Sequence, residues 1–156
     1  MPPQKPIRWQ DLMKPGPTVK ALCFGINKYD HLGALDNCEA DADAMAERVS
    51  RLPGNCTARV CKGGQLKDKA AMRAEIVKFV QGIDKDAPPR VVLVSYSGHA
   101  VQHGESILMV PGGAPKEPEA LKQACFSHDE LFEILYQEMH KKTSVSRCCP
   151  RRGLPG

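Results

Sequence analysis

One histidine stands where an imidazole can do chemistry. Arg90 to Ala100 is a run of mostly β-branched and apolar residues that opens into Ser97-Gly98-His99. Such a run predicts a buried strand, and open α/β sheets carry their chemistry at the carboxyl ends of their strands. An imidazole placed there can act as a general base near neutral pH, so His99 is the first candidate catalytic residue. The competing interpretation is a structural histidine whose hydrogen bonds are satisfied.

The elements that must position His99 alternate between strands and helices. Apolar runs predict strands, and apolar residues at helical spacing predict helices between them. We expect Asp36 or Asn37 to cap the first of these helices. Strand, helix, strand, helix, strand is the alternation of right-handed crossovers in a parallel sheet. The predicted strands are 19–26, 58–61 and 90–97, and the predicted helices are 42–52 and 66–83.

The chain after His99 contains a further strand and a third helix. Gly104-Glu105 suits a turn, and the apolar run behind it predicts a short antiparallel or edge strand that closes over the histidine. Residues 112–118 are expected to form a loop. Ser127 precedes Glu130 by three residues, and this capping-box spacing predicts that a helix begins there.

Composition indicates one domain and argues against two classes of partner. With 156 residues, 42% of them hydrophobic, the chain can build one sizeable core. The net charge of +4 depends on the last sixteen residues, so nucleic-acid binding gets no support. No apolar run reaches membrane-spanning length, and seven scattered cysteines favour a reducing, cytoplasmic compartment. We divide the chain into a flexible arm (1–17), a folded domain (18–142) and a basic, disordered tail (143–156).

Three stretches of this sequence occur together: Ala21 to Tyr29, Ala40-Asp41-Ala42, and Val94 to Ala100 with its Tyr-Ser-Gly-His core. The combination resembles the large-subunit region of the caspase and metacaspase superfamily of cysteine peptidases. The resemblance implies a three-layer α/β sandwich with a mostly parallel sheet and helices on both faces. Family members continue into a small-subunit segment. We therefore expect a truncated chain whose sheet is incomplete at its C-terminal edge.

The resemblance also implies catalytic roles. A cysteine thiolate would attack the scissile carbonyl, His99 would handle the protons, and the amides of Ala100 and of the cysteine would stabilise the oxyanion. Cys149 is the favoured nucleophile because it follows the histidine by fifty residues (149 − 99 = 50), with Cys148 as the alternative. Cys125 lies within a Gln-Ala-Cys match but only 26 residues downstream (125 − 99 = 26), so we interpret it as structural. Arg147 replaces the acid that metacaspase-like members have before the nucleophile.

Substrate preference is implied by the same resemblance. Asp41 matches the aspartate that contributes to the basic-residue pocket of metacaspase-like members, so Arg or Lys at P1 is favoured over Asp. Metacaspase relatives are often calcium-stimulated. The acids around Asp41 lack an oxygen-ligand loop pattern, and the cysteine spacing does not suit zinc, so we expect no metal and no cofactor.

Two function classes remain open. The first is a cysteine endopeptidase with a His99–Cys149 dyad, acting on a protein or peptide substrate. The second is a catalytically inactive relative that keeps the fold and binds a homologous caspase-like chain as an interaction protein. A nucleotide-binding protein is disfavoured, because no phosphate-binding loop follows the first predicted strand.

Overall fold

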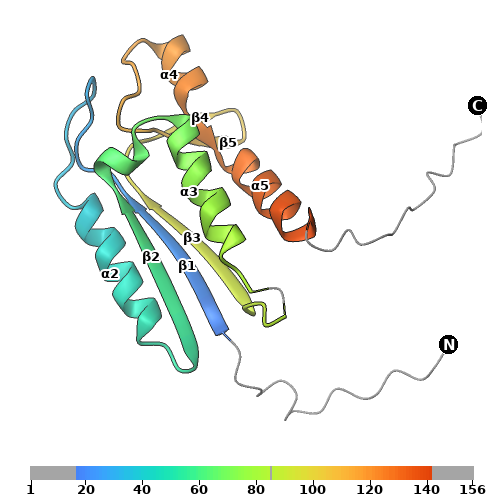
Figure 1. Cartoon of the computed structure of the whole chain (residues 1–156). Coiled ribbons are helices and arrows are strands. Elements are labelled where there is room, and N and C mark those ends of the chain that lie inside the picture. The colour runs from blue at the N-terminus through green and yellow to red at the C-terminus, as the bar shows by residue number, and fades with distance from the viewer. Residues whose placement is uncertain (1–16, 85, 142–156) are drawn as a thin grey trace, which may run out of the picture.

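The centre of the fold is a three-stranded parallel sheet. The computed structural model describes residues 17–84 and 86–141. The sheet has the order β2-β1-β3, from β1 (Pro17–Gly25), β2 (Asn55–Lys62) and β3 (Val91–Ser97). Helix α2 (Cys38–Ser50) covers one face, while α3 (Lys69–Gln81) and α5 (His128–Lys141) lie over the other (Figure 1). The predicted α/β sandwich, with helices on both faces of a parallel sheet, is confirmed.

Strand β1 is buried on both faces because it lies between two strands and two helical layers. Its small residues Ala21 and Cys23 belong to the apolar cluster under α2, and Leu22 and Phe24 belong to the larger cluster on the opposite face. At Gly25 the helix comes so close that an added Cβ would lie 2.4 Å from the carbonyl oxygen of Cys38. The small residues therefore let α2 approach the sheet, and the large ones fill the space beneath α3.

The cap of α2 comes from a distant residue. Asn27, in the loop after β1, accepts a hydrogen bond from the backbone N–H of Glu39 through its Oδ1 atom at 2.9 Å. Asn37 occupies the N-cap position, but its side chain makes no capping bond, and Asp36 contributes its carbonyl oxygen to Asn27 at 3.5 Å. The expectation that the side chain of Asp36 or Asn37 caps the helix is therefore wrong.

The second helical segment is divided in two. A short 3-10 helix, η1 (Gly63–Leu66), follows β2, and α3 begins only at Lys69. Asp68 caps the second part, since its Oδ1 accepts from the backbone N–H of Ala71 at 2.7 Å. A side chain that satisfies a free helix donor sets the helix start there. One continuous helix from residue 66 was therefore predicted too long.

A second, antiparallel sheet follows β3. It consists of β4 (Ala100–His103), β5 (Ser106–Met109) and β6 (Phe126–Ser127) in that order. Gly104 lies in the hairpin turn with a φ of 60°, which glycine adopts without steric cost. The predicted antiparallel strand after His99 is confirmed. Helix α4 (Pro118–Ala124) was not predicted, and it starts where Glu117 accepts a hydrogen bond from the N–H of Ala120 at 3.0 Å.

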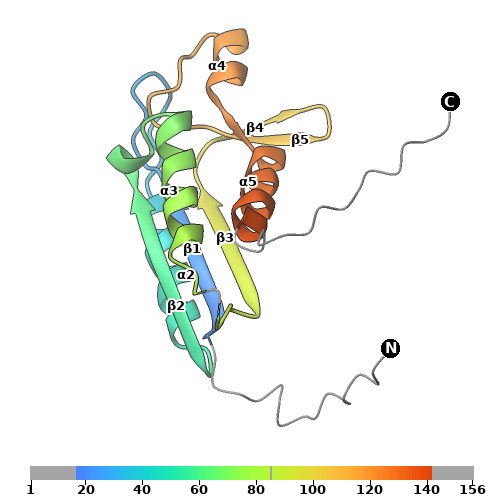
Figure 2. The same ribbon diagram turned by 45° about the vertical axis from the view of Figure 1, so that its right-hand side comes forward.

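The capping box predicted at the start of α5 is confirmed in both directions. Ser127 Oγ accepts from the N–H of Glu130 at 3.1 Å, and Glu130 Oε2 accepts from the N–H of Ser127 at 3.2 Å. Glu130 also pairs with Lys69 at 2.7 Å through its other oxygen, which joins the starts of α5 and α3. The turned view shows the two helices on the same side of the main sheet (Figure 2).

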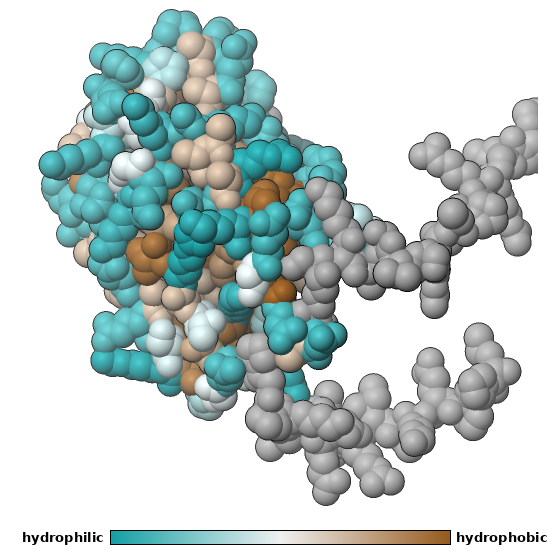
Figure 3. Space-filling view, in the orientation of Figure 1, coloured by the Kyte–Doolittle hydropathy of each residue, from teal (hydrophilic) through white to brown (hydrophobic). Residues whose placement is uncertain are grey.

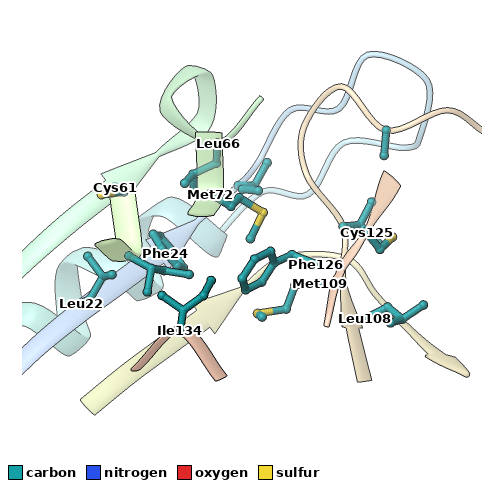
Figure 4. Packing of buried hydrophobic residues seen from close by; sticks show 14 of the residues in the cluster. Leu22, Phe24, Cys61, Leu66, Met72, Leu108, Met109, Cys125, Phe126 and Ile134 are labelled. Carbon is teal, nitrogen blue, oxygen red and sulfur yellow. The ribbon is translucent and has the colours of Figure 1, made fainter. Parts of the chain in front are cut away.

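The larger core cluster joins the two sheets. Side chains from β1, α3, the second sheet and α5 converge in it, among them Phe24, Met72, Phe126 and Ile134 (Figure 4). The surface is mostly hydrophilic in the view of Figure 3, with hydrophobic side chains in small separate areas. Within the described residues, no helix has the length and apolar composition needed to cross a bilayer. The predictions of a flexible arm and a disordered tail concern residues that lie almost wholly outside the described ranges.

Candidate active site

His99 lies at the carboxyl end of β3, in the short link that leads from the parallel sheet into the second sheet. Its imidazole Nε2 is 2.7 Å from the carbonyl oxygen of Gly33, in the loop between β1 and α2. A carbonyl oxygen only accepts, so the neutral ring must carry its proton on Nε2. The lone pair is then on Nδ1, which gives the ring one defined basic atom.

Two tyrosines hold the backbone around His99. Tyr29 Oη accepts the N–H of His99 at 2.8 Å, and its ring packs against the imidazole with centroids 4.6 Å apart. Tyr96 Oη lies 2.7 Å from the His99 carbonyl oxygen and 3.4 Å from Tyr29 Oη. Burial raises the pKa of both phenols, so both hydroxyls keep their protons across the neutral range.

Ala100 is the first residue of β4, and its N–H points away from β5. The register places Ala100 opposite Met109, which sets His99 opposite Val110, and Val110 N donates to His99 O at 3.0 Å. In an antiparallel pair the backbone groups of successive residues point alternately toward and away from the partner strand. Ala100 therefore directs its donor to the outer edge of β4, and no other strand pairs with this edge in the described part of the chain.

Asp41 is brought to the same edge of the sheet. It lies in the first turn of α2, and its Oδ2 accepts a hydrogen bond from Ser97 Oγ at 3.0 Å. Ser97 is the last residue of β3, two positions before His99. The exposed Asp41 carboxylate is therefore bonded to a residue two positions before the candidate base, although 58 residues separate Asp41 from His99 in sequence (99 − 41 = 58).

Of the three candidate nucleophiles, the structure describes only Cys125. Cys149 and Cys148 lie outside the described residues. Cys125 is only 2% exposed, and burial raises the pKa of its thiol. Reactive cysteines need the opposite conditions, namely access and a lowered pKa. In residues 17–84 and 86–141, no three His, Cys, Asp or Glu side chains are grouped to hold a metal ion.

Sequence reasoning missed three contributors to this site: Gly33, Tyr29 and Ser97. The carbonyl oxygen of Gly33 is a backbone atom, so no residue type signals it. Tyr29 lies 70 positions from His99, and only the pairing of β1 with β3 brings the two together. Ser97 was visible beside the histidine, but its bond to α2 depends on how the helix crosses the sheet.

A parallel sheet with helices on both faces and a histidine at its carboxyl edge defines the class of α/β proteins, which carry their functional sites at this edge. Comparison with known families is more specific. The model for Peptidase C14, described as the caspase domain, matches residues 18–153, and the chain belongs to this family of cysteine peptidases. The predicted resemblance is thereby confirmed.

Individual relatives agree with the family. The chain is 30% identical over 153 residues to Metacaspase-2 of Trypanosoma brucei brucei (strain 927/4 GUTat10.1), an alignment that covers 90% of this chain and 44% of the relative. It is also 30% identical to Metacaspase-3 of Trypanosoma brucei brucei, with 90% and 42% covered. The chain thus spans less than half the length of these curated relatives.

Proposed function

We propose that this chain acts as a cysteine endopeptidase of the caspase class, with His99 as the base and Cys149 as the nucleophile. The observation that carries the proposal is the imidazole at the end of β3, whose Nε2 is fixed on the Gly33 carbonyl oxygen and whose Nδ1 is left as the base. Family membership supports the cysteine partner. The substrate class is a protein or peptide, without a cofactor.

Each protein group has a defined part in the reaction. His99 Nδ1 takes the proton from the Cys149 thiol, and the thiolate sulfur attacks the scissile carbonyl carbon. The oxyanion that forms accepts a hydrogen bond from the outward N–H of Ala100. The imidazolium then gives its proton to the leaving amine, the C–N bond breaks, and water hydrolyses the acyl-enzyme with His99 again as the base.

Chain length allows the nucleophile to reach the base. Helix α5 runs back toward the amino end of β3 (Figures 1 and 2). Eight residues lead from Lys141 to Cys149 (149 − 141 = 8), a span of about 26 Å when extended. The seven residues of β3 measure about 23 Å. The outer edge of β3 also has no partner among the described strands.

The proposal includes the P1 residue and the compartment. Asp41 offers a carboxylate at the carboxyl edge of the sheet, and a carboxylate there favours Arg or Lys at P1 over Asp.

The five cysteines of the described region are all free thiols, which supports a reducing compartment such as the cytoplasm.

The alternative is a catalytically inactive relative that binds a homologous caspase-like chain. It is favoured by one observation, namely that no described strand pairs with the outer edge of β3, because an open strand edge is a template for pairing with another chain. In that case His99 has no reactive thiol beside it.

Thiol reactivity separates the two functions. The full chain is treated with limiting iodoacetamide near pH 7, and mass spectrometry maps which cysteine is modified fastest. The peptidase proposal expects Cys149 to react far faster than Cys125, to lose that advantage in His99→Ala, and to keep it in His103→Ala, which removes an exposed histidine from β4. Cys148→Ser and Cys149→Ser identify which of the two sulfurs reacts.

The reaction rates also decide the next experiment. A fast, His99-dependent cysteine calls for a peptide library with Arg, Lys or Asp at P1. Equal rates at all exposed cysteines, unchanged by His99→Ala, would remove the peptidase proposal and leave the binding role.

A further inference from the structure

Two tyrosine hydroxyls take the place of one ladder hydrogen bond beside His99. Opposed residues of this kind normally exchange two bonds, N–H to O in each direction. Val110 N donates to His99 O at 3.0 Å, but the reciprocal bond is replaced. His99 N donates to Tyr29 Oη at 2.8 Å, and Val110 O accepts a hydrogen bond from the Tyr96 hydroxyl at 2.9 Å. The His99–Val110 pair therefore lacks one of its two backbone hydrogen bonds, and the missing bond lies beside the candidate base.

Tyr29 contacts His99 at two points that together fix the ring. Its hydroxyl holds the His99 N–H, and its ring lies against the imidazole at an interplanar angle of 60°. Tyr29 is itself only 8% exposed, so its own side chain is held in place by packing. The hydrogen bond to the His99 backbone and the contact with its ring together limit the side-chain rotations of His99, and these rotations determine where Nε2 and Nδ1 point.

The space over Gly98 is filled by the same two hydroxyls. A Cβ added at Gly98 would lie 2.6 Å from Tyr29 Oη and 2.6 Å from Tyr96 Oη. The hydroxyls thus close directly over the backbone that precedes His99. This explains why a glycine stands before the histidine.

We propose that Tyr29 is a positioning residue that holds His99 in the orientation with Nε2–H on the Gly33 carbonyl oxygen and Nδ1 turned to the nucleophile. The inference rests on the proposed function for its catalytic consequence, whereas the orientation itself can be measured without any activity. Without the Tyr29 hydroxyl, the N–H of His99 would turn to Val110 O, its usual ladder partner. That movement draws the residue toward β5 and takes the ring from Gly33.

The test compares imidazole tautomers in the full chain by nuclear magnetic resonance, using ¹⁵N-labelled histidine. Tyr29→Phe keeps the ring and removes the acceptor. Tyr136→Phe is the matched control, because Tyr136 also packs on a histidine ring, that of His140 at 4.1 Å, yet is 66% exposed. We expect a protonated Nε2 and an unprotonated Nδ1 for His99 in the wild type and in Tyr136→Phe. In Tyr29→Phe the two ¹⁵N shifts should converge toward a tautomer mixture.

The alkylation rate of the nucleophilic cysteine gives a second readout. It should fall at least about tenfold in Tyr29→Phe, since displacements of about 1 Å at a reacting group cost that much or more. Unchanged ¹⁵N shifts of His99 in a folded Tyr29→Phe chain overturn the inference. If Tyr29→Phe does not fold, the wild-type chain itself is the test, because a held ring must show a single tautomer. A His99 whose two ¹⁵N shifts already indicate a tautomer mixture in the wild type overturns the inference.

The two proposals can fail separately. Converging shifts in Tyr29→Phe without a fast cysteine in the wild type would support positioning and reject the dyad. The dyad would be supported and positioning rejected if a cysteine reacts fast and depends on His99, while Tyr29→Phe changes neither its alkylation rate nor the His99 tautomer.

Discussion

The orientation of one imidazole depends on atoms from distant parts of the chain. The Gly33 carbonyl oxygen holds Nε2 of His99, and Tyr29 holds its N–H. All these partners come from loops or strand ends at the carboxyl edge of the parallel sheet. A general base works only if its lone pair is aimed, so the loop between β1 and α2 contributes as much to the candidate site as the strand that carries the histidine.

Asp41 should determine the charge preference at P1. In an active chain, Asp41→Arg should lower cleavage after Arg or Lys by about tenfold or more, because a charge-assisted hydrogen bond is replaced by repulsion. Asp43→Arg is the control, since Asp43 lies on the same helix but pairs with Lys62 at 2.5 Å. Steady-state cleavage of peptides that differ only at P1 measures the effect. Retention of the basic preference in Asp41→Arg would refute this role.

Cys61 should make stability depend on alkaline pH. Burial, assisted by the nearby Glu75 carboxylate, raises the pKa of this thiol from 9.0 to about 11. Below pH 9 the thiol is protonated in both states. Between pH 9 and 11 the unfolded chain loses the proton while the folded chain keeps it, so stability falls as the pH rises. From pH 8 to pH 11, the wild type should lose about 2 kcal/mol more unfolding free energy than Cys61→Ala.

Urea titrations at each pH give these free energies. The comparison with Cys61→Ala cancels the other groups that titrate in this range. Parallel pH curves for the two chains would mean that Cys61 contributes no such linkage.

At the scale of the elements, the sequence predicted what depends on local periodicity and missed what depends on the fold. The strand that leads to His99 and the capping box of Ser127 and Glu130 were predicted because their signals lie within a few residues. The source of the α2 cap was not, because Asn27 reaches Glu39 only after β1 and α2 have packed together. The side chains around His99 were missed for the same reason, since sheet pairing brings them together.

The cap of α2 can be tested with two asparagines. Asn27→Ala removes the acceptor for the N–H of Glu39 and should lower the free energy of unfolding by about 1 kcal/mol. Asn37→Ala is the matched control, because Asn37 occupies the N-cap position without a side-chain bond, and it should change stability by less than about 0.5 kcal/mol. Chemical denaturation of both variants measures this. Equal losses would show that the distant residue is not the cap.

At the scale of the whole molecule, one strand belongs to two cores. The cluster under α2 and the larger cluster that reaches the second sheet both take residues from β1, at alternate positions. Neither cluster can open without exposing that strand. The described part of the chain is therefore expected to unfold as one cooperative unit.

Thiol protection measures this cooperativity. Cys23 is buried in the cluster under α2, while Cys61 and Cys125 are buried in the larger one. Pulsed alkylation across a urea series should therefore modify all three at one common midpoint, whereas the half-buried Cys38 and Cys56 should react without urea. Modification of Cys23 at lower urea than Cys61 would show instead that the α2 layer separates first.

The link between the two sheets has a mechanical consequence. β3 ends at Ser97 and β4 begins at Ala100, so His99 stands at the pivot between a sheet anchored in the core and a short hairpin that projects from it. A force on the hairpin is transmitted to this pivot through the bonds at Val110. Any displacement of the hairpin at Val110 would therefore act first on the backbone of His99, whose carbonyl oxygen accepts the Val110 N–H.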